Sequence, residues 1–253
     1  MADAIGLLLP DVNQRTKDAM GTDTQNQFKD SAVTVDGAQL SMRIGGTGAP
    51  IVLFHSLLAD ASSFDRITDA LLATHQVILL HLPGFGGSTR VEGGLEAVAD
   101  RVGAAIKALA LPQPPIFLGN GYGGFVALTT AIRHPGIAAK LVLADCGAAF
   151  SEPGRAAFRG MSAGAAAKGL EGIADVAMRR LFSPEFQAKN AALTAERRAR
   201  FIAVDPQTFH NACAALAELD VRDKLASVKV PVDRKSTRLN SSHPQQSRMP
   251  SSA

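Results

Sequence analysis

Short apolar runs alternate with amphipathic segments between residues 51 and 144. An uninterrupted apolar run is typical of a strand buried on both faces, and apolar residues spaced three or four apart are typical of a helix. Strands that alternate with helices favour one parallel sheet with right-handed crossovers. The predicted strands are at 51–54, 76–80, 115–118 and 141–144, and the predicted helices are at 62–72, 95–109 and 122–133.

The pattern is different before this region. Residues 1–30 have no strong period after Pro10, and they predict a leader that packs on the domain or stays loose. Apolar positions then predict two short strands at 32–35 and 39–44. Asp36-Gly37 between them is a hairpin signal.

The strand pattern stops after residue 146. Residues 147–204 predict several short helices, with turn signals at Pro153-Gly154 and Ser183-Pro184. A helix at 206–219 and the beginning of a strand at 228–232 follow. An all-helical insertion in a parallel sheet is typical of a lid over a binding site.

The last segment of the chain has another chemistry. It contains few apolar residues and no helical or strand period, and it resembles a translated sequencing-library adapter. Asp233–His243 and Ser247–Ala253 can be encoded by consecutive adapter segments, in the right order and in one reading frame. We therefore expect 233–253 to be an exposed, artefactual tail that is unrelated to the fold.

These patterns predict five segments. They are the leader at 1–30, an α/β core at 31–146, the helical lid at 147–204, a return helix with the start of the next core strand at 205–232, and the tail at 233–253. The fold class is α/β, a mostly parallel sheet with helices on both faces. We expect the sheet to be incomplete at its C-terminal edge.

Charge and composition exclude several classes of function. The tail carries the whole formal net charge of +3, so the basic pI near 9.0 gives the folded part no reason to bind nucleic acid. Cys146 and Cys213 have no metal-ligand spacing, so we expect no metal and no disulfide framework. No apolar run is long enough to span a membrane, and Ala4–Leu9 is too short for a signal peptide. We expect a cytoplasmic protein without a cofactor, and the sequence leaves its oligomeric state open.

The strongest chemical signal is the segment 118–124, Leu-Gly-Asn-Gly-Tyr-Gly-Gly. It follows a predicted strand and opens a predicted helix, which is the setting of the nucleophile elbow G-x-S-x-G. Gly119 and Gly123 occupy the two small-residue positions. The central position, where the motif has serine, is Gly121.

Four blocks in order resemble the α/β-hydrolase superfamily, most closely its lidded lactonases, esterases and ring-cleavage-product hydrolases. The resemblance covers about residues 31–232. The blocks are His55-Ser56-Leu57-Leu58, the loop from Leu82 to Ser88, the elbow with Phe125 to Leu128 after it, and Arg133-His134-Pro135 before the strand that ends at Asp145.

The resemblance implies a site position by position. His55-Ser56 matches the family's His-Gly pair, so the backbone amides of Leu57 and Tyr122 match the two oxyanion donors. Gly121 matches the nucleophilic serine, and glycine has no atom that attacks a carbonyl. The family's acid and histidine are expected after the strand that starts near Val230, beyond the family-like sequence. No catalytic residue is then intact, and we expect no ester hydrolysis by this chain.

Four other residues are pocket candidates. His55 is expected to brace the oxyanion loop, and Ser56 has no base that the sequence can name. Asn120 is expected to serve the turn, and Asp145 to cap a strand end, although both lie where catalytic residues gather. His210 is expected on a helix as a packing or surface residue.

Two hypotheses of function remain. In the first, the native protein carries out serine-independent chemistry with a histidine and an acid, of the lyase, hydrolase or cofactor-free oxygenase type. In the second, the protein is a non-catalytic pseudo-hydrolase that binds a small apolar molecule under the Ala/Leu/Phe-rich lid. A plain serine hydrolase is excluded by Gly121.

Overall fold

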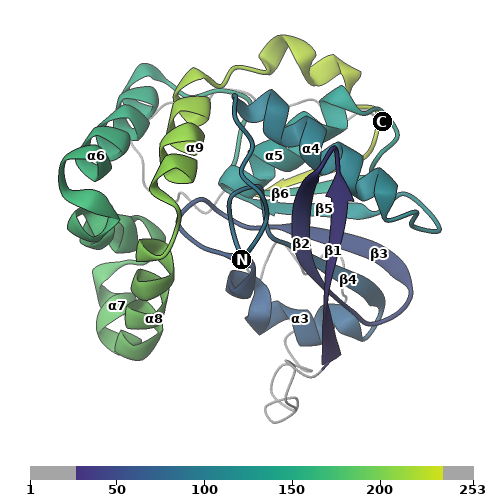
Figure 1. Ribbon diagram of the computed structural model, residues 1–253, viewed down its shortest axis with the longest axis horizontal. Helices are drawn as coiled ribbons and strands as arrows, with labels where there is room; N and C mark the ends of the chain where they lie inside the picture. Colours follow the sequence, from purple (N-terminus) through teal and green to yellow (C-terminus); the bar gives the residue numbers. More distant parts are fainter. Residues whose placement is uncertain (1–26, 236–253) are drawn as a thin grey trace.

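The computed structural model describes residues 27–235, and these residues form one mixed sheet with helices on both faces (Figure 1). Within the described range the sheet has seven strands in the order β1-β2-β4-β3-β5-β6-β7. The strands are β1 (Phe28–Val35), β2 (Ala38–Gly45), β3 (Ala49–Phe54), β4 (His75–Leu80), β5 (Ile116–Asn120), β6 (Lys140–Ala144) and β7 (Val232–Lys235). The α-helices are α3 (Asp65–Leu72), α4 (Leu95–Ala108), α5 (Tyr122–Arg133), α6 (Glu152–Leu181), α7 (Pro184–Lys189), α8 (Ala191–Ile202) and α9 (Pro206–Glu218), and the 3₁₀ helices are η2 (Ala61–Phe64) and η3 (Arg222–Ser227).

The predicted hairpin and the predicted parallel core are confirmed. β1 and β2 are antiparallel, β2 is antiparallel to β4, and every later pair is parallel. Asp36 and Gly37 both have positive φ, +51° and +74°, which is the geometry of a two-residue turn that matches strand twist. The α/β-hydrolase fold class inferred from the sequence is correct.

Alternate residues of the central strands are buried on opposite faces of the sheet. Val52 and Phe54 of β3 belong to the larger core cluster, which contains residues of α4, α5, α6 and α9. Ile51 and Leu53 belong to the smaller cluster with Phe64 and residues of α3. The uninterrupted apolar runs follow from this arrangement, because each central strand is covered on both sides.

The helical segment 147–204 lies to one side of the sheet (left in Figure 1), and we call it the helical insert. α6 packs against α8 and α9, and α9 connects the insert to the core. Several short helices were predicted at 147–204. α6 consists of two helical parts joined by a kink at Gly169, where the backbone is not helical and φ is +70°, and α7 and α8 follow it. The turn predicted at Pro153-Gly154 is wrong, because proline needs no N–H partner in the first turn of a helix.

The C-terminal strand differs from its prediction. Residues 228–232 were expected to begin it, but β7 runs from Val232 to Lys235 and pairs in parallel with β6. Three residues of the expected tail therefore take part in the sheet, and the Asp145 amide donates to the Lys235 carbonyl oxygen over 2.8 Å. The other tail residues, 236–253, lie outside the described residues, as does most of the predicted leader. The last residues of the predicted leader, 28–30, belong to β1.

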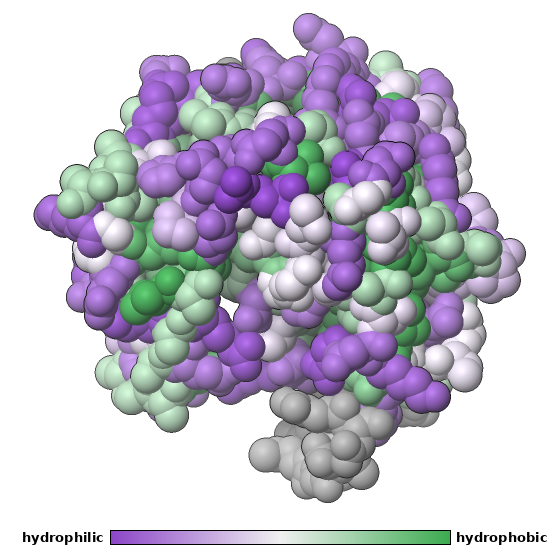
Figure 2. All heavy atoms as spheres, viewed as in Figure 1, coloured by the Kyte–Doolittle hydropathy of each residue, from purple (hydrophilic) through white to green (hydrophobic). Residues whose placement is uncertain are grey.

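The surface of the described part offers no broad apolar face. Polar and apolar residues are interspersed over the face shown in Figure 2. Val176 and Val232 are the exposed large hydrophobic residues between 27 and 235. None of the helices in this range is long and apolar enough to cross a membrane.

The end of β3 lies very close to the first turn of α5. A Cβ atom added to Gly123 would lie 2.1 Å from the Phe54 carbonyl oxygen and 2.5 Å from that of His55. Both atoms belong to the backbone, which gives way less readily than a side chain. Glycine at 123 is therefore a requirement of packing.

We predict that Gly123→Ala destabilises the protein by at least about 2 kcal/mol, because the added methyl group overpacks a rigid contact. Gly160→Ala is the matched control, since no atom lies within 4 Å of a Cβ built on this helical glycine. Alanine there should leave stability unchanged or raise it. Chemical denaturation of both variants measures the difference, and equal stabilities would contradict the packing argument.

Candidate functional site

Gly121 forms the apex between β5 and α5. Its φ is +53° and its ψ is −120°, which confirms the positive φ predicted for the elbow. The Gly121 amide donates to the Ala144 carbonyl oxygen over 2.9 Å, and the Gly121 carbonyl oxygen accepts from the amides of Gly124 and Phe125. The turn is therefore fixed by β6 on one side and by the start of α5 on the other.

His55 braces the loop that follows β3. The Leu82 amide donates to Nε2 over 3.2 Å, so Nδ1 carries the proton and donates to the Ser56 carbonyl oxygen over 3.0 Å. The ring is fully buried and meets the Phe85 ring edge-on. Burial lowers the pKa of His55 to about 4, so the imidazole is neutral at pH 7. Both nitrogens are engaged, and His55 is positioned as a structural residue.

The Ser56 side chain lies against the apex of the elbow. A Cβ atom built on Gly121 would be 2.9 Å from Ser56 Oγ and 3.5 Å from Ser56 Cβ. Ser56 and Gly121 are both partly exposed. The structure thus brings together two residues that are 65 positions apart in the chain.

The amides of Leu57 and Tyr122 donate to no acceptor within the described residues. Both residues are buried, with 3% and 5% of their surface exposed. A buried amide without a partner is rare, because it loses its hydrogen bonds to water without replacing them. The Tyr122 amide opens α5, and the first amides of a helix have no partner within the helix.

The other two pocket candidates lie at the same end of the sheet. Asn120 ends β5, pairs with Ala144 of β6, and is partly exposed. Asp145 follows β6 directly, is exposed, and has a φ of +50°. No hydrogen bond of either side chain exists within residues 27–235. The structure therefore places both near the elbow without showing a contact that defines their role.

An ionic cluster ties α8 of the helical insert to the loop after β3. Asp60 caps η2 by accepting from the Ser62 amide over 3.0 Å, and it accepts from Arg200 of α8 over 3.0 Å. Arg197, only 11% exposed, lies 3.5 Å from Asp60 and donates to Ser62 Oγ and to the Ser62 carbonyl oxygen.

The same cluster sets the charge of Asp60. Burial alone would raise the pKa of this carboxyl group, but the hydrogen bond from Ser62 and the Arg200 guanidinium outweigh it. The pKa is lowered, and Asp60 is ionised at pH 7. Sequence reasoning missed this cluster. Asp60 is recognisable as a helix cap, but its arginine partners lie about 140 positions away.

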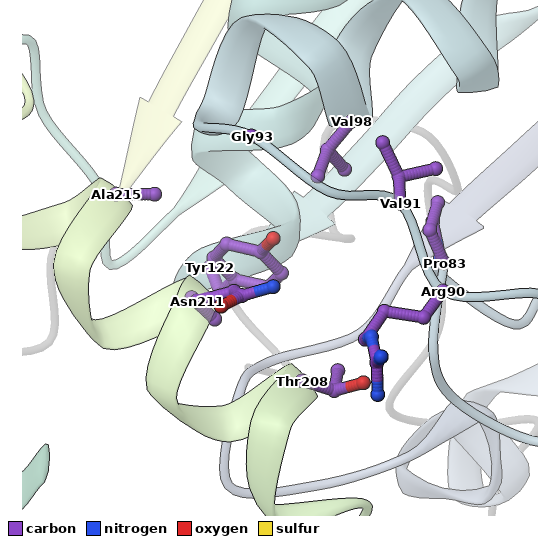
Figure 3. Close-up of a pocket in the computed structure, with 10 residues that line it drawn as sticks. Pro83, Arg90, Val91, Gly93, Val98, Tyr122, Thr208, Asn211 and Ala215 are labelled. Carbon is purple, nitrogen blue, oxygen red and sulfur yellow. The ribbon is translucent and has the colours of Figure 1, made fainter.

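Tyr122 lines a narrow cavity between the segment after β4 and α9 (Figure 3). The cavity has a volume of about 10 Å³, which is room for roughly one water molecule. Burial raises the pKa of Tyr122, so its phenol stays protonated. The lining residues are Pro83, Arg90, Val91, Gly93, Val98, Tyr122, Thr208, Asn211, Ala212 and Ala215. Their polar members, Arg90, Thr208 and Asn211, were not among the predicted site residues.

A larger hollow of about 290 Å³ lies between α6 and α9. Ser162 belongs to its lining, and Ser162 Oγ lies 2.8 Å from His210 Nδ1. His210 of α9 therefore has a side-chain partner on α6. The lining residues are Arg159, Ser162, Ala163, Ala166, Cys213 and Ala214.

The described residues contain no group of three or more histidine, cysteine or acidic residues that could hold a metal ion. Cys146 and Cys213 are free thiols, and burial raises the pKa of each to about 12. Neither thiol is ionised near neutral pH, so neither is an activated nucleophile.

Comparison with known proteins agrees with the fold. A model of the alpha/beta hydrolase family matches residues 51–247. This chain belongs to the alpha/beta hydrolase family.

The chain is 30% identical over 200 residues to 3-oxoadipate enol-lactonase 1 of Acinetobacter baylyi, and the aligned region covers 77% of this chain and 73% of the relative. Two solved structures share its fold at 24% identity. A hydrolase from Pseudomonas aeruginosa has a TM-score of 0.75, and the match covers 83% of this chain and 80% of the Pseudomonas chain. The enol-lactonase from Burkholderia xenovorans has a TM-score of 0.74 and covers 81% and 80%.

We predict that His55 makes this protein acid-labile. An unfolded histidine has a pKa near 6.5, above the folded value of about 4, so the unfolded state binds more protons between these pH values. Stability is therefore present above pH 6.5 and is lost as the pH falls toward 4, by about 3 kcal/mol from this residue.

Chemical denaturation between pH 7 and pH 4 measures this loss in the wild type and in His55→Gln. The variant should lack the His55 component, while the contributions of other groups stay in both proteins. NMR titration of the wild-type ring provides a check that does not depend on a variant. An imidazole that becomes protonated near pH 6.5 would show that His55 is not buried in its neutral form.

Proposed function

We propose that this chain binds a small carbonyl compound of the ester or lactone class without forming a covalent intermediate at position 121. The Leu57 and Tyr122 amides hold the carbonyl oxygen of the ligand. The observation that carries the proposal is that the amides of these two buried residues lack an acceptor within the described residues. A carbonyl oxygen is the acceptor that such amides bind.

The position of Tyr122 supports this choice of ligand. Its amide opens α5, a helix of 12 residues, whose N-terminus carries partial positive charge. The Leu57 amide belongs to the loop that His55 and Asp60 fix. The two donors therefore come from rigid segments, and little order has to be gained when a ligand binds.

Relatives support the class of ligand. Two of them are named enol-lactonases, and a lactone is a cyclic ester. Gly121 differs from the serine of a nucleophile elbow, because glycine has no side-chain oxygen to attack that ester. In the proposed mode this chain therefore binds the carbonyl group but forms no acyl intermediate at position 121.

The unpaired amides also favour a second candidate, the serine-independent chemistry of the native protein. In this case a histidine and an acid activate water or abstract a proton from the bound compound. The family resemblance implies that these two groups come after the last core strand, beyond the family-like sequence. The amides perform the same binding step in both candidates.

We expect δ-valerolactam, a hydrolysis-resistant analogue of a six-membered lactone, to bind at the elbow. In a ¹⁵N-labelled sample the amide signals of Leu57 and Tyr122 should shift on titration, and those of α4 should not. Peptide mapping after incubation with 4-nitrophenyl acetate should find no acetyl group in residues 55–60 or 119–124.

The outcomes test the binding mode. Lactam binding without turnover of the ester supports non-covalent binding in this chain, and turnover without an acetyl adduct would reveal chemistry that forms no acyl group at the elbow. Unchanged Leu57 and Tyr122 signals at saturating lactam would refute the proposed binding mode. An acetyl group on either mapped segment would refute the non-covalent mode.

A further inference from the structure

The Ser56 hydroxyl group occupies the space that a side chain at the elbow would use. Ser56 Oγ lies 2.9 Å from the Cβ position of residue 121, closer than two such atoms approach without one of them moving. Position 121 itself contributes no side chain. Apart from residues 120 and 122, its neighbours in the chain, the nearest side-chain atom to this position therefore comes from the loop after β3.

This hydroxyl group has no hydrogen-bond partner within residues 27–235, and Ser56 is partly exposed. Two other serines near this loop, Ser62 and Ser88, have partners. Ser62 Oγ binds Asp60 and Arg197, and Ser88 Oγ donates to the His81 carbonyl oxygen over 2.7 Å. The Ser56 hydroxyl is thus available to a ligand.

The backbone of Ser56 is fixed. Its carbonyl oxygen accepts from His55 Nδ1 over 3.0 Å and from the Ala59 amide over 3.2 Å. Rotation about one side-chain bond is the freedom that remains to the hydroxyl group. The next amide in the chain is that of Leu57, which also lacks a partner, so one short loop offers two donors side by side.

We propose that Ser56 supplies the side-chain hydroxyl that the elbow lacks, and that it determines specificity by contacting the ligand at Gly121. The inference rests on the proposed function, because it concerns the same carbonyl ligand. A methyl group at position 121 forces Ser56 Oγ to rotate away from the apex, so Gly121→Ala removes a contact that belongs to Ser56.

The test is a titration of δ-valerolactam against the wild type, Ser56→Ala, Gly121→Ala and the double variant. Each single change should raise Kd about three- to tenfold, the loss of one hydrogen bond. The double variant should bind no more weakly than Ser56→Ala, because the hydroxyl is already absent. Gly136→Ala is the control for backbone strain, since Gly136 has a φ of +81° and no atom within 4 Å of its Cβ position.

Melting temperatures of all five proteins separate structural effects from binding. Gly136→Ala should melt at a lower temperature than the wild type with Kd unchanged, and Ser56→Ala should melt within a few degrees of the wild type with Kd raised.

If Ser56→Ala binds as tightly as the wild type, the inference is wrong and the proposed function stands. Additive losses in the double variant would also overturn it. If the wild type does not bind, both proposals are wrong. Should Gly121→Ala fail to fold, Ser56→Ala alone still decides.

Discussion

The site depends on the close approach of β3 and α5 at Gly123. The first turn of α5 lies directly on the carbonyl groups of Phe54 and His55, with no side chain between the two backbones. This contact brings the end of one parallel strand next to the beginning of a helix that follows another strand. The Ser56 side chain meets the elbow as a result, where the Tyr122 amide begins α5. Gly121 has its left-handed conformation at the same junction.

Two interactions of different kinds hold the loop after β3. At its beginning the neutral His55 ring links the loop to the Leu82 amide through hydrogen bonds within the core. At its end the charged Asp60 binds Arg197 and Arg200 of the helical insert. A buried neutral group and a partly buried ion pair respond differently to pH, because acid charges the first and neutralises the second. The insert is thereby coupled to the loop that carries the proposed ligand donors.

The sequence predicted the sheet well because its signals are local. The strands β3 to β6 and the helix α5 follow from apolar runs and from glycine spacing, and the positive φ of Gly121 follows from the elbow motif. Contacts between distant segments were not predictable. Ser56 meets Gly121, and Asp60 meets Arg200, only after the chain has folded. β7 begins later than predicted because strand pairing with β6, rather than local apolar character, determines its register.

The central claim is that a carbonyl group binds to two backbone amides and to the Ser56 hydroxyl at an elbow without a nucleophile. A high-resolution crystal structure of the chain with δ-valerolactam tests this most directly. The account predicts the lactam oxygen within hydrogen-bonding distance, about 3 Å, of the Leu57 and Tyr122 amide nitrogens and of Ser56 Oγ. A lactam bound elsewhere in the molecule, with the two amides turned toward protein acceptors, would contradict it.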